Sequence, residues 1–283
     1  MAGESRSAVR DDGVEAATRL LSVVIVPFLL AAFVVLYGFP DRTSEWFAWG
    51  IDPPMTAMTL GAVYLGGAYF FVSAARARAW HAIRTGFVAV GTFATTMGVA
   101  TIVHWGRFTH DHVAFWLWAG LYFTTPFLVW GAWAANQRRA RPAAPGEAVL
   151  TRGGRRALAA TGALAVVTGA FCLLWPARAI DVWPWALTPL TSRVVGAILL
   201  LGVAALGVLA DPRWTATRLL LRVEVVMLSL ILVAAVRARD DFDTANPLTW
   251  VLLGGFLASL VGAAVLSRRG SPPPAAAPLE AAG

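Results

Sequence analysis

Eight long apolar runs constrain this chain more than any other feature of its sequence. Their lengths fall within the roughly 17 to 25 residues that a helix needs to cross a bilayer core of about 30 Å. Backbone groups cannot reach water inside hydrocarbon, so such runs must form helices or closed barrels. The runs are continuous and lack two-residue alternation, which favours helices over barrel strands. They cover residues 20–37, 55–74, 85–103, 113–135, 157–174, 191–210, 219–236 and 248–266.

The composition agrees with a chain that is surrounded by lipid. Hydrophobic residues make up 58% of the 283 positions and charged residues only 14%, whereas soluble domains are about half apolar and a quarter charged. The sequence therefore predicts an all-α, polytopic membrane helix bundle whose main partner is the lipid bilayer. Residues 1–18 precede the first run, which is long enough to remain as an anchor.

The basic residues are placed unevenly around the eight runs. All 23 are arginines. With the N-terminus in the cytoplasm, most of them fall on the cytoplasmic side, which is the bias that orients membrane helices. The sequence thus predicts a cell-membrane protein with both termini cytoplasmic, and it argues against nucleic-acid binding despite the net charge of +7. The arginines on the opposite side are Arg42, Arg107, Arg178, Arg193, Arg237 and Arg239.

The second half of the chain resembles the first. At an offset of 136 residues the alignment pairs aromatic and proline positions, and after a two-residue adjustment it continues at an offset of 134. Internal similarity at a fixed spacing indicates a duplicated unit. The matched pairs include Pro40 with Pro176, Trp49 with Trp185, Pro53 with Pro189, Trp80 with Trp214, Phe108 with Phe242, Trp116 with Trp250 and Gly120 with Gly254.

Each unit holds four runs, an even number, so the two units cross the membrane in the same sense as parallel repeats. The organisation predicted is a cytoplasmic segment at 1–18, a first repeat at 19–135, a cytoplasmic linker at 136–156, a second repeat at 157–267 and a disordered cytoplasmic tail at 268–283. In both repeats, Asp52 or Thr188 precedes a proline, a pattern that predicts a helix N-cap with proline in the first turn. The tryptophans just before these caps suit the membrane interface.

Glu224 is the most costly residue in the predicted membrane region. It lies about five positions inside the seventh run, or roughly 8 Å along the helix, and no residue three or four positions away can pair with it. A buried carboxylate needs a partner or a proton. The third run carries a stripe of polar residues, and packing of the third run on the seventh would bring Thr92 and Thr96 near Glu224. We expect a proton-, cation- or solute-binding point there, or else a structural hydrogen bond.

A second polar group gathers in the loops after the third and seventh runs. Imidazole and carboxylate ligands suit a divalent zinc, manganese or iron ion, although the spacing matches no metal motif. The alternative is a solvated loop in which Asp111 and Asn246 cap the next helices. Haem is not expected, because axial ligation by two histidines needs a second one at similar depth. The candidate metal ligands are His104, His110, His112, Asp240, Asp241 and Asp243.

Small residues and prolines recur inside the apolar runs. Two series have four-residue spacing, Thr161, Ala165 and Gly169 in the fifth run and Gly254, Ala258 and Gly262 in the eighth, and both predict close approach of another helix. Pro27 and Pro126 have no counterpart in the second repeat, and kinked helices often border cavities.

Three classes of function fit these residues. The duplication, Glu224 and the unmatched prolines favour a carrier of a small solute or ion, with a site near the repeat interface. The alternatives are a non-catalytic membrane scaffold or complex subunit, and a membrane metal or redox protein that uses the outer ligands. The absence of the usual catalytic motifs argues against an enzyme, and no resident cofactor is predicted beyond the metal of that last alternative.

Overall fold

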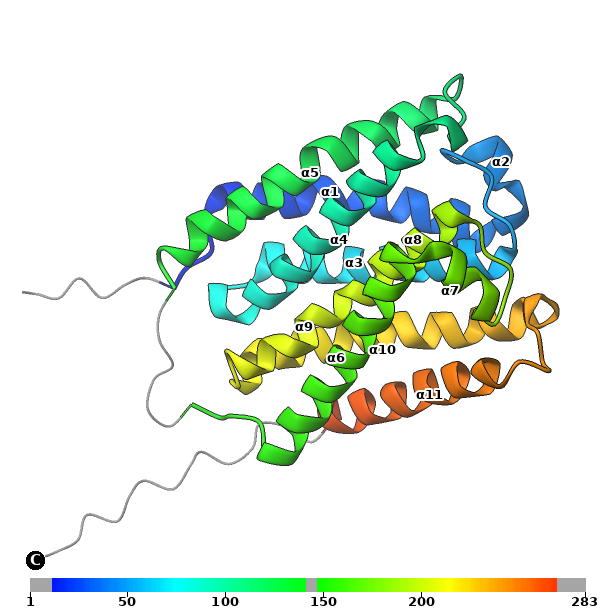
Figure 1. Ribbon diagram of the computed structural model, residues 1–283. Helices are drawn as coiled ribbons and strands as arrows, with labels where there is room; N and C mark the ends of the chain where they lie inside the picture. Colours follow the sequence, from blue (N-terminus) through cyan, green and yellow to red (C-terminus); the bar gives the residue numbers. More distant parts are fainter. Residues whose placement is uncertain (1–11, 141–146, 269–283) are drawn as a thin grey trace, which may run out of the picture.

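The computed structural model describes residues 12–140 and 147–268, and it is an all-α bundle (Figure 1). Eight helices in these ranges are long and apolar enough to span a membrane, so the prediction of a polytopic helical membrane protein is confirmed. Parts of the predicted N-terminal segment and linker, and nearly all of the predicted tail, lie outside the described residues. The spans are α1 (Ala16–Phe33) with the π-helical turn η1 (Val34–Gly38), α3 (Pro54–Arg76), α4 (Arg84–Val103), α5 (Val113–Gln137), α6 (Arg152–Leu174), α8 (Pro189–Leu199) continued through η5 (Leu200–Gly202), α9 (Val203–Leu206) and η6 (Gly207–Leu209), α10 (Trp214–Arg237), and α11 (Pro247–Arg268).

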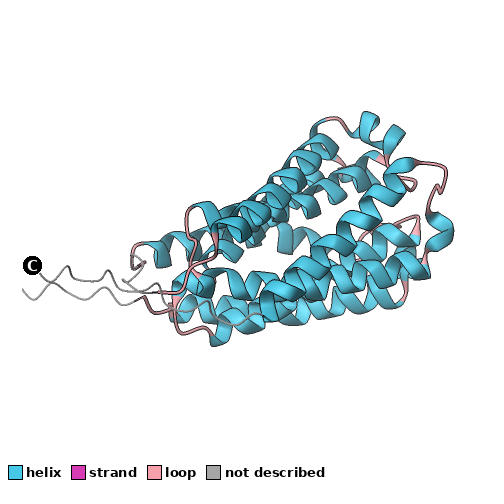
Figure 2. Cartoon of the chain, turned by 90° about the horizontal axis from the view of Figure 1, so that it is seen from below, coloured by secondary structure: helices cyan, strands magenta, loops and turns pink. Residues whose placement is uncertain are grey.

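Short helical segments lie in the connections between the spans. They are η2 (Pro40–Arg42), α2 (Thr43–Trp46), η3 (Trp80–Ala82), η4 (Trp105–Arg107), α7 (Pro176–Val182) and η7 (Arg239–Asp241). We call the end of the bundle at which α1 begins and α11 ends the terminal face, and the other end the opposite face (Figures 1 and 2).

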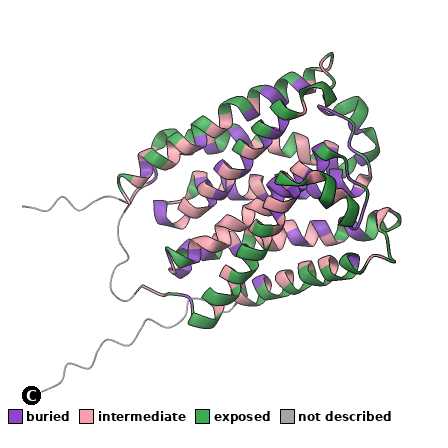
Figure 3. Cartoon of the chain, viewed as in Figure 1, coloured by how far each residue is buried: buried purple, intermediate pink, exposed green. Residues whose placement is uncertain are grey.

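The exposed surface of the spans is strongly apolar. Val113 is 81% exposed, Phe127 78% and Val236 72%. Such exposure would be unfavourable in water but suits helices whose outer sides meet lipid. Burial is uneven among the spans, from 78% of the most apolar stretch of α3 to 11% of that of α11. The bundle thus has central and peripheral helices (Figure 3).

The helices pack in pairs that correspond between the two halves. In the first half α1 packs on α3 and α4 packs on α5, while in the second half α6 packs on α8 and α10 packs on α11. The halves meet through α3 against α10 and through α4 against α8. The predicted repeat partner of α3 is α8, and that of α10 is α4. The contact of α3 with α10 therefore corresponds to the contact of α8 with α4. This arrangement is what a parallel duplication would produce.

Individual contacts also recur at the offsets of the sequence repeat. The ring of Trp49 packs edge-on against Phe108 at 5.1 Å between centroids, and that of Trp185 against Phe242 at 5.4 Å. The alignment rests on residue identities alone, so recurring contacts are independent support for the duplication. Three hydrogen bonds recur likewise: the amide of Thr109 to the carbonyl of Ala48 (3.0 Å) and of Asp243 to Pro184 (2.8 Å), the amide of Trp80 to Asp12 (2.7 Å) and of Trp214 to Ala148 (2.8 Å), and the indole of Trp116 to His110 (2.9 Å) and of Trp250 to Thr244 (3.2 Å).

The two predicted proline caps differ in the structure. Thr188 caps α8 as predicted, because its hydroxyl accepts from the amide of Thr191 in a capping box. α3 instead begins at Pro54, and no side chain caps it. The prediction of an Asp52 cap was therefore wrong. Asn246 does accept from the amide of Leu248 at 3.0 Å at the start of α11.

Glycines hold α6 close to α8. A Cβ on Gly169 would lie 2.7 Å from the carbonyl oxygen of Gly196, and a Cβ on Gly162 would lie 2.7 Å from that of Gly202. Only residues without a side chain permit such an approach of two backbones. The stripe predicted on α11 does not behave this way, because Gly254 would meet nothing within 4 Å, so that prediction was wrong.

Charged groups join the halves at the terminal face. Asp211 is 4% exposed and accepts hydrogen bonds from Arg213, the shortest at 2.6 Å, and from Arg84 at 3.1 Å. Nearby, His81 contacts Asp12 through Nδ1 and Thr215 through Nε2. Arg84 and His81 belong to the first half, whereas Asp211 and Thr215 belong to the second. These contacts therefore fix the two halves at this end.

Candidate solute-binding cavity

Glu224 lies deep in the bundle on α10. The helix begins at Trp214, ten residues earlier, which at 1.5 Å per residue places Glu224 about 15 Å from the helix start and near the middle of the span. The apolar run alone indicated about 8 Å. The difference arises because α10 starts five residues before that run, in a segment that contains Arg218.

The carboxylate of Glu224 has no partner among the residues that the structure describes. No hydrogen bond or ion pair reaches it, and Arg218 and Arg222 on the same helix are exposed. Arg222 is two residues away and so lies on the other side of the helix. Leaving an ionised carboxylate unpaired in a medium of low dielectric constant is costly. A carboxylate in this position is therefore expected to take up a proton or a cation.

Glu224 lines a cavity of about 260 Å³ between the two halves, which we call the Glu224 cavity. Its walls come from α3, α4, α6, α8 and α9, α10 and α11, and they are mostly apolar. Glu224 is the one acidic or basic side chain among the described residues that line it. The hydroxyl groups in the lining belong to Thr59, Tyr64, Thr161, Thr217 and Ser259.

Some of these hydroxyls also lack partners. Thr59 is only 5% exposed, and its Oγ1 atom is fully buried without a hydrogen bond. Within the described chain, the hydroxyls of Thr161 and Ser259 form no hydrogen bond either, whereas the hydroxyl of Thr217 donates to the carbonyl of Arg213 at 3.2 Å. Thr161 is exposed and Ser259 partly exposed, so the cost of about 1–3 kcal/mol for an unsatisfied buried hydroxyl applies to Thr59 alone. The cavity thus offers a carboxylate and free hydroxyls to a guest.

Thr92 and Thr96 do not join Glu224. Their hydroxyls donate to the carbonyls of Val88 at 2.9 Å and of Thr92 at 2.8 Å within α4, and neither residue lines the Glu224 cavity. α10 packs mainly on α3 and α11 rather than on α4. The binding role of Glu224 stays a prediction, and the geometry gives these threonines no part in it.

Gly66 sets the packing of α3 beside Glu224. A Cβ on Gly66 would lie 2.2 Å from Cγ of Met227, three residues after Glu224 on the same face of α10. The missing side chain lets Met227 fill the space against α3. The wall of the cavity next to Glu224 depends on this contact.

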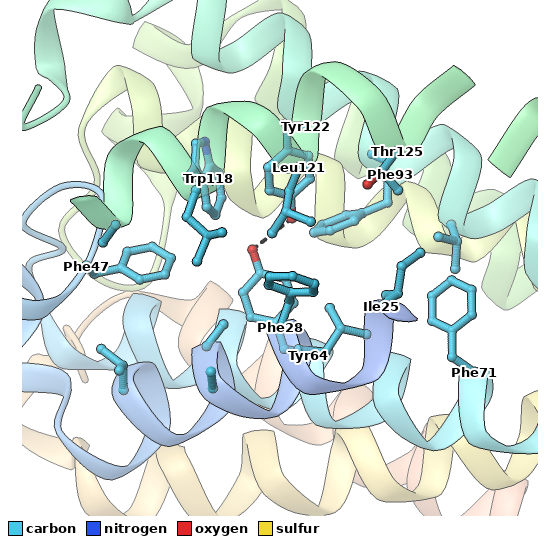
Figure 4. A pocket seen from close by; sticks show the side chains of 18 of the residues that line it. Ile25, Phe28, Phe47, Tyr64, Phe71, Phe93, Trp118, Leu121, Tyr122 and Thr125 are labelled. Carbon is cyan, nitrogen blue, oxygen red and sulfur yellow. Dashed lines mark hydrogen bonds between the residues drawn. The ribbon is translucent and has the colours of Figure 1, made fainter. Parts of the chain in front are cut away.

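A second cavity, of about 190 Å³, lies within the first half (Figure 4). We call it the Tyr122 cavity. Its lining residues come from α1 to α5, and many are the repeat equivalents of residues that line the Glu224 cavity. The equivalent pairs are Ile25 and Thr161, Leu29 and Ala165, Phe47 and Trp183, Val90 and Glu224, Phe93 and Met227, Ala94 and Leu228, Tyr122 and Phe256, and Thr125 and Ser259.

The two cavities are neighbours with different chemistry. Tyr64, Val90 and Phe93 line both of them. The acidic group stands only in the second-half copy, since its first-half equivalent is Val90. The internal sequence alignment already pairs Val90 with Glu224. Only the structure shows that both residues line cavities.

His104 lies at the opposite face beside two arginines. Its Nε2 is 2.7 Å from an Nη atom of Arg193. Partial burial lowers the pKa of His104, and the charges of Arg193 and Arg107 lower it further. The neutral form of the imidazole is therefore favoured, and the guanidinium beside it would repel a metal cation.

The other predicted metal ligands are engaged separately. A carboxylate oxygen of Asp241 accepts from the amide of Met55 at 2.8 Å, Asp243 accepts from the amide of Ala245 at 2.9 Å, and Asp240 faces Arg239 at 3.6 Å. The described part of the chain contains no group of three or more His, Cys, Asp or Glu side chains placed to hold a metal. The structure does not bring the predicted ligands together.

His110 and His112 stay apart from that set. The ring of His110 packs edge-on against Phe115 at 4.6 Å between centroids. Its Nε2 and the Nδ1 of His112 are buried without partners. Both nitrogens therefore lack a hydrogen-bond partner, but they do not form a metal site.

The surroundings of Glu224 remain the arrangement with the most specific chemistry, because they combine a deep cavity, an unpaired carboxylate and free hydroxyls. Comparison with protein-family models, with curated proteins and with solved structures gives no match for this chain.

Proposed function

We propose that this multi-pass membrane protein is a carrier for a small solute or ion that binds at Glu224. The observation that supports the proposal most directly is that this carboxylate lines a cavity between the two halves, near mid-span, without a partner among the described residues. Carriers built from repeats bind their solutes near the bilayer midplane at the interface between the repeats. The location of the cavity between the two halves, with Glu224 near the middle of its helix, supports such a site.

The walls of the cavity favour one kind of solute. A divalent metal ion without its water shell requires about six oxygen ligands, and the lining supplies one carboxylate and scattered hydroxyls in an otherwise apolar surface. A proton, or a small organic cation with an apolar body, is matched better. The carboxylate would neutralise its charge, and the apolar walls would bury its carbon atoms.

The experiment that tests this proposal is a flux measurement in proteoliposomes. Under an imposed gradient, we expect proteoliposomes that contain the protein to take up protons, radiolabelled methylammonium or radiolabelled tetraethylammonium. Glu224→Gln removes the charge but keeps the shape, so we expect flux to fall at least tenfold. Glu45→Gln is the matched control, because Glu45 lies in α2 at the opposite face with its side chain 57% exposed beside Arg42, and we expect it to transport normally.

Labelling with dicyclohexylcarbodiimide supplies a readout that does not need the right solute. The reagent adds to protonated carboxyl groups in apolar surroundings, so mass spectrometry should find it on Glu224 and not on Glu45. A carrier would show labelling together with flux. A scaffold would fold normally and move none of the three probes, and that result, or equal flux in Glu224→Gln, would contradict the proposal.

A further inference from the structure

The Tyr122 cavity differs from the Glu224 cavity in being uncharged. Of the described residues that line it, none is acidic or basic. Phe28, Phe47, Phe71, Phe93 and Trp118 give it largely aromatic walls (Figure 4). A charged guest would find no counter-ion there, whereas a flat apolar guest would meet ring faces and edges on several sides.

A pair of phenol groups is the main polar feature of this cavity. Tyr64 from α3 and Tyr122 from α5 point toward each other, and their hydroxyl oxygens are 2.8 Å apart (Figure 4). Tyr64 is 4% exposed and Tyr122 8% exposed, so water does not readily reach either group. Each hydroxyl has one proton to donate, and the bond between them uses only one.

The second phenol proton therefore has no acceptor among the described residues. Whichever tyrosine donates to the other, the accepting hydroxyl keeps its own hydrogen free at the cavity wall. Leaving a buried donor unsatisfied costs about 1–3 kcal/mol. Thr125 adds a further hydroxyl to the lining, also without a hydrogen bond in the described chain. The cavity thus offers free donors and no charge.

The mouth of the cavity opens between α1 and α5. α1 packs chiefly on α3 and α5 chiefly on α4, so these two helices contact each other little. Ala31 of α1 and Leu117 of α5 line the cavity and are also exposed. Both lie within membrane-spanning helices, so the opening faces the lipid rather than the water. The unmatched prolines flank the same site, since Pro27 lies between Ile25 and Phe28 and Pro126 directly follows Thr125.

We propose that the Tyr122 cavity binds a neutral, lipid-soluble molecule through a carbonyl or ether oxygen, which accepts a hydrogen bond from the free phenol. The guest enters sideways from the bilayer between α1 and α5, and its rings or short chains fill the aromatic walls. This site is independent of Glu224, whose equivalent here is Val90. The inference therefore does not rest on the proposed carrier function.

Benzophenone is a suitable probe, because it is an apolar aromatic ketone that cross-links to nearby C–H bonds under near-ultraviolet light. In proteoliposomes we expect it to label the segments 25–35 and 114–125, as read by mass spectrometry. Diphenylmethane has the same skeleton without the oxygen. At equal membrane content we expect it to compete about fivefold to tenfold less well than unlabelled ketone, the effect of one net hydrogen bond.

The double variant Tyr64→Phe with Tyr122→Phe removes both hydroxyls together. Replacing both partners of a hydrogen bond by apolar groups is close to neutral for stability, so we expect the protein to fold and the preference for the ketone to disappear. Tyr69→Phe is the matched control, since Tyr69 is on α3 and does not line the cavity. It should keep the preference.

Ala31→Trp tests the route of entry. Ala31 is exposed, so a larger side chain there would cover the mouth without disturbing the packed interior, and labelling should be lost. Glu224→Gln should leave labelling unchanged, which separates this proposal from the carrier proposal. Absence of benzophenone label from the two segments would overturn the proposed site. Equal competition by ketone and hydrocarbon in the unaltered protein would also overturn it, and would indicate a site for acyl chains instead.

Discussion

At the scale of single residues, a carboxylate occupies only one of two equivalent positions in the two halves. Glu224 and Val90 occupy equivalent places in the two cavities, as do Thr161 and Ile25. A carboxylate inside a membrane bundle raises the free energy of the folded protein. Its presence in one cavity and not in the other therefore points to a role in binding. The cavity lined by Glu224 thus contains a carboxylate, whereas the Tyr122 cavity has apolar walls with a pair of phenols.

The ion pairs of Asp211 give a prediction about stability and pH. Burial alone would raise the pKa of Asp211, but hydrogen bonds from Arg213 and the charges of Arg213 and Arg84 outweigh it and lower that pKa below its ordinary value of 3.8. The stabilisation is therefore complete above the unfolded-state value. It is lost as the pH falls through the lower folded-state value.

Asp211→Asn should remove this stabilisation at neutral pH, because buried Arg213 loses its closest carboxylate and keeps the more distant one of Glu147, at 3.7 Å. We expect a loss of about 3–5 kcal/mol and a weaker dependence of unfolding on acid than in the unaltered protein. Thermal unfolding in detergent between pH 7 and pH 3 measures both. Asp240→Asn is the control, because that side chain is 93% exposed. Equal melting of the Asp211 variant and the unaltered protein at neutral pH would show that the network does not stabilise the fold.

At the scale of helices, the close contact of α6 with α8 can be tested at one glycine. In Gly196→Ala the new Cβ would lie 2.7 Å from the carbonyl oxygen of Gly169 and 2.8 Å from Cγ of Leu173, so the backbones must move apart. We expect a loss of about 1–3 kcal/mol, typical of overpacking. Gly254→Ala on α11 meets nothing within 4 Å and should unfold at an unchanged or slightly higher temperature. Similar melting of both variants would contradict this description of the interface.

The sequence could predict the existence of all eight spans because each is a long run without alternation. Their ends were less predictable, since a helix continues into the interface wherever backbone bonds and packing allow. α10 is the clearest example: the residues before its apolar run include Arg218, and yet the helix starts at Trp214. The depth of Glu224 changed for that reason. The cap at Asp52 failed because α3 begins one residue later, at Pro54.

The neighbours of Glu224 could not be predicted from periodicity. A polar stripe on the third run gave Thr92 and Thr96, but threonine in a helix can satisfy its hydroxyl on its own backbone, as both do here. Which helix faces which is decided by packing across the whole bundle. The hydroxyls of Thr59 and Ser259 belong to runs that showed no polar stripe, and only the tertiary arrangement brings them to the cavity.

At the scale of the whole molecule, the distribution of arginines predicts that the terminal face is cytoplasmic. Single cysteines in a Cys172→Ala background test this orientation. We expect a membrane-impermeant maleimide to label Arg107→Cys in intact cells, and to label Arg78→Cys only after the cells are permeabilised. Both parent residues are exposed, at opposite ends of the bundle. The reverse pattern of labelling would place the termini outside the cell.

The pairing of the halves carries a consequence for the molecule as a unit. Tyr64, Val90 and Phe93 form one layer of side chains with a hollow on each side of it. A guest that displaced the Tyr64 ring in one cavity would also change the space in the other cavity. With both proposed guests bound, this shared wall would couple the two sites, although the chemistry of each site is independent of the other.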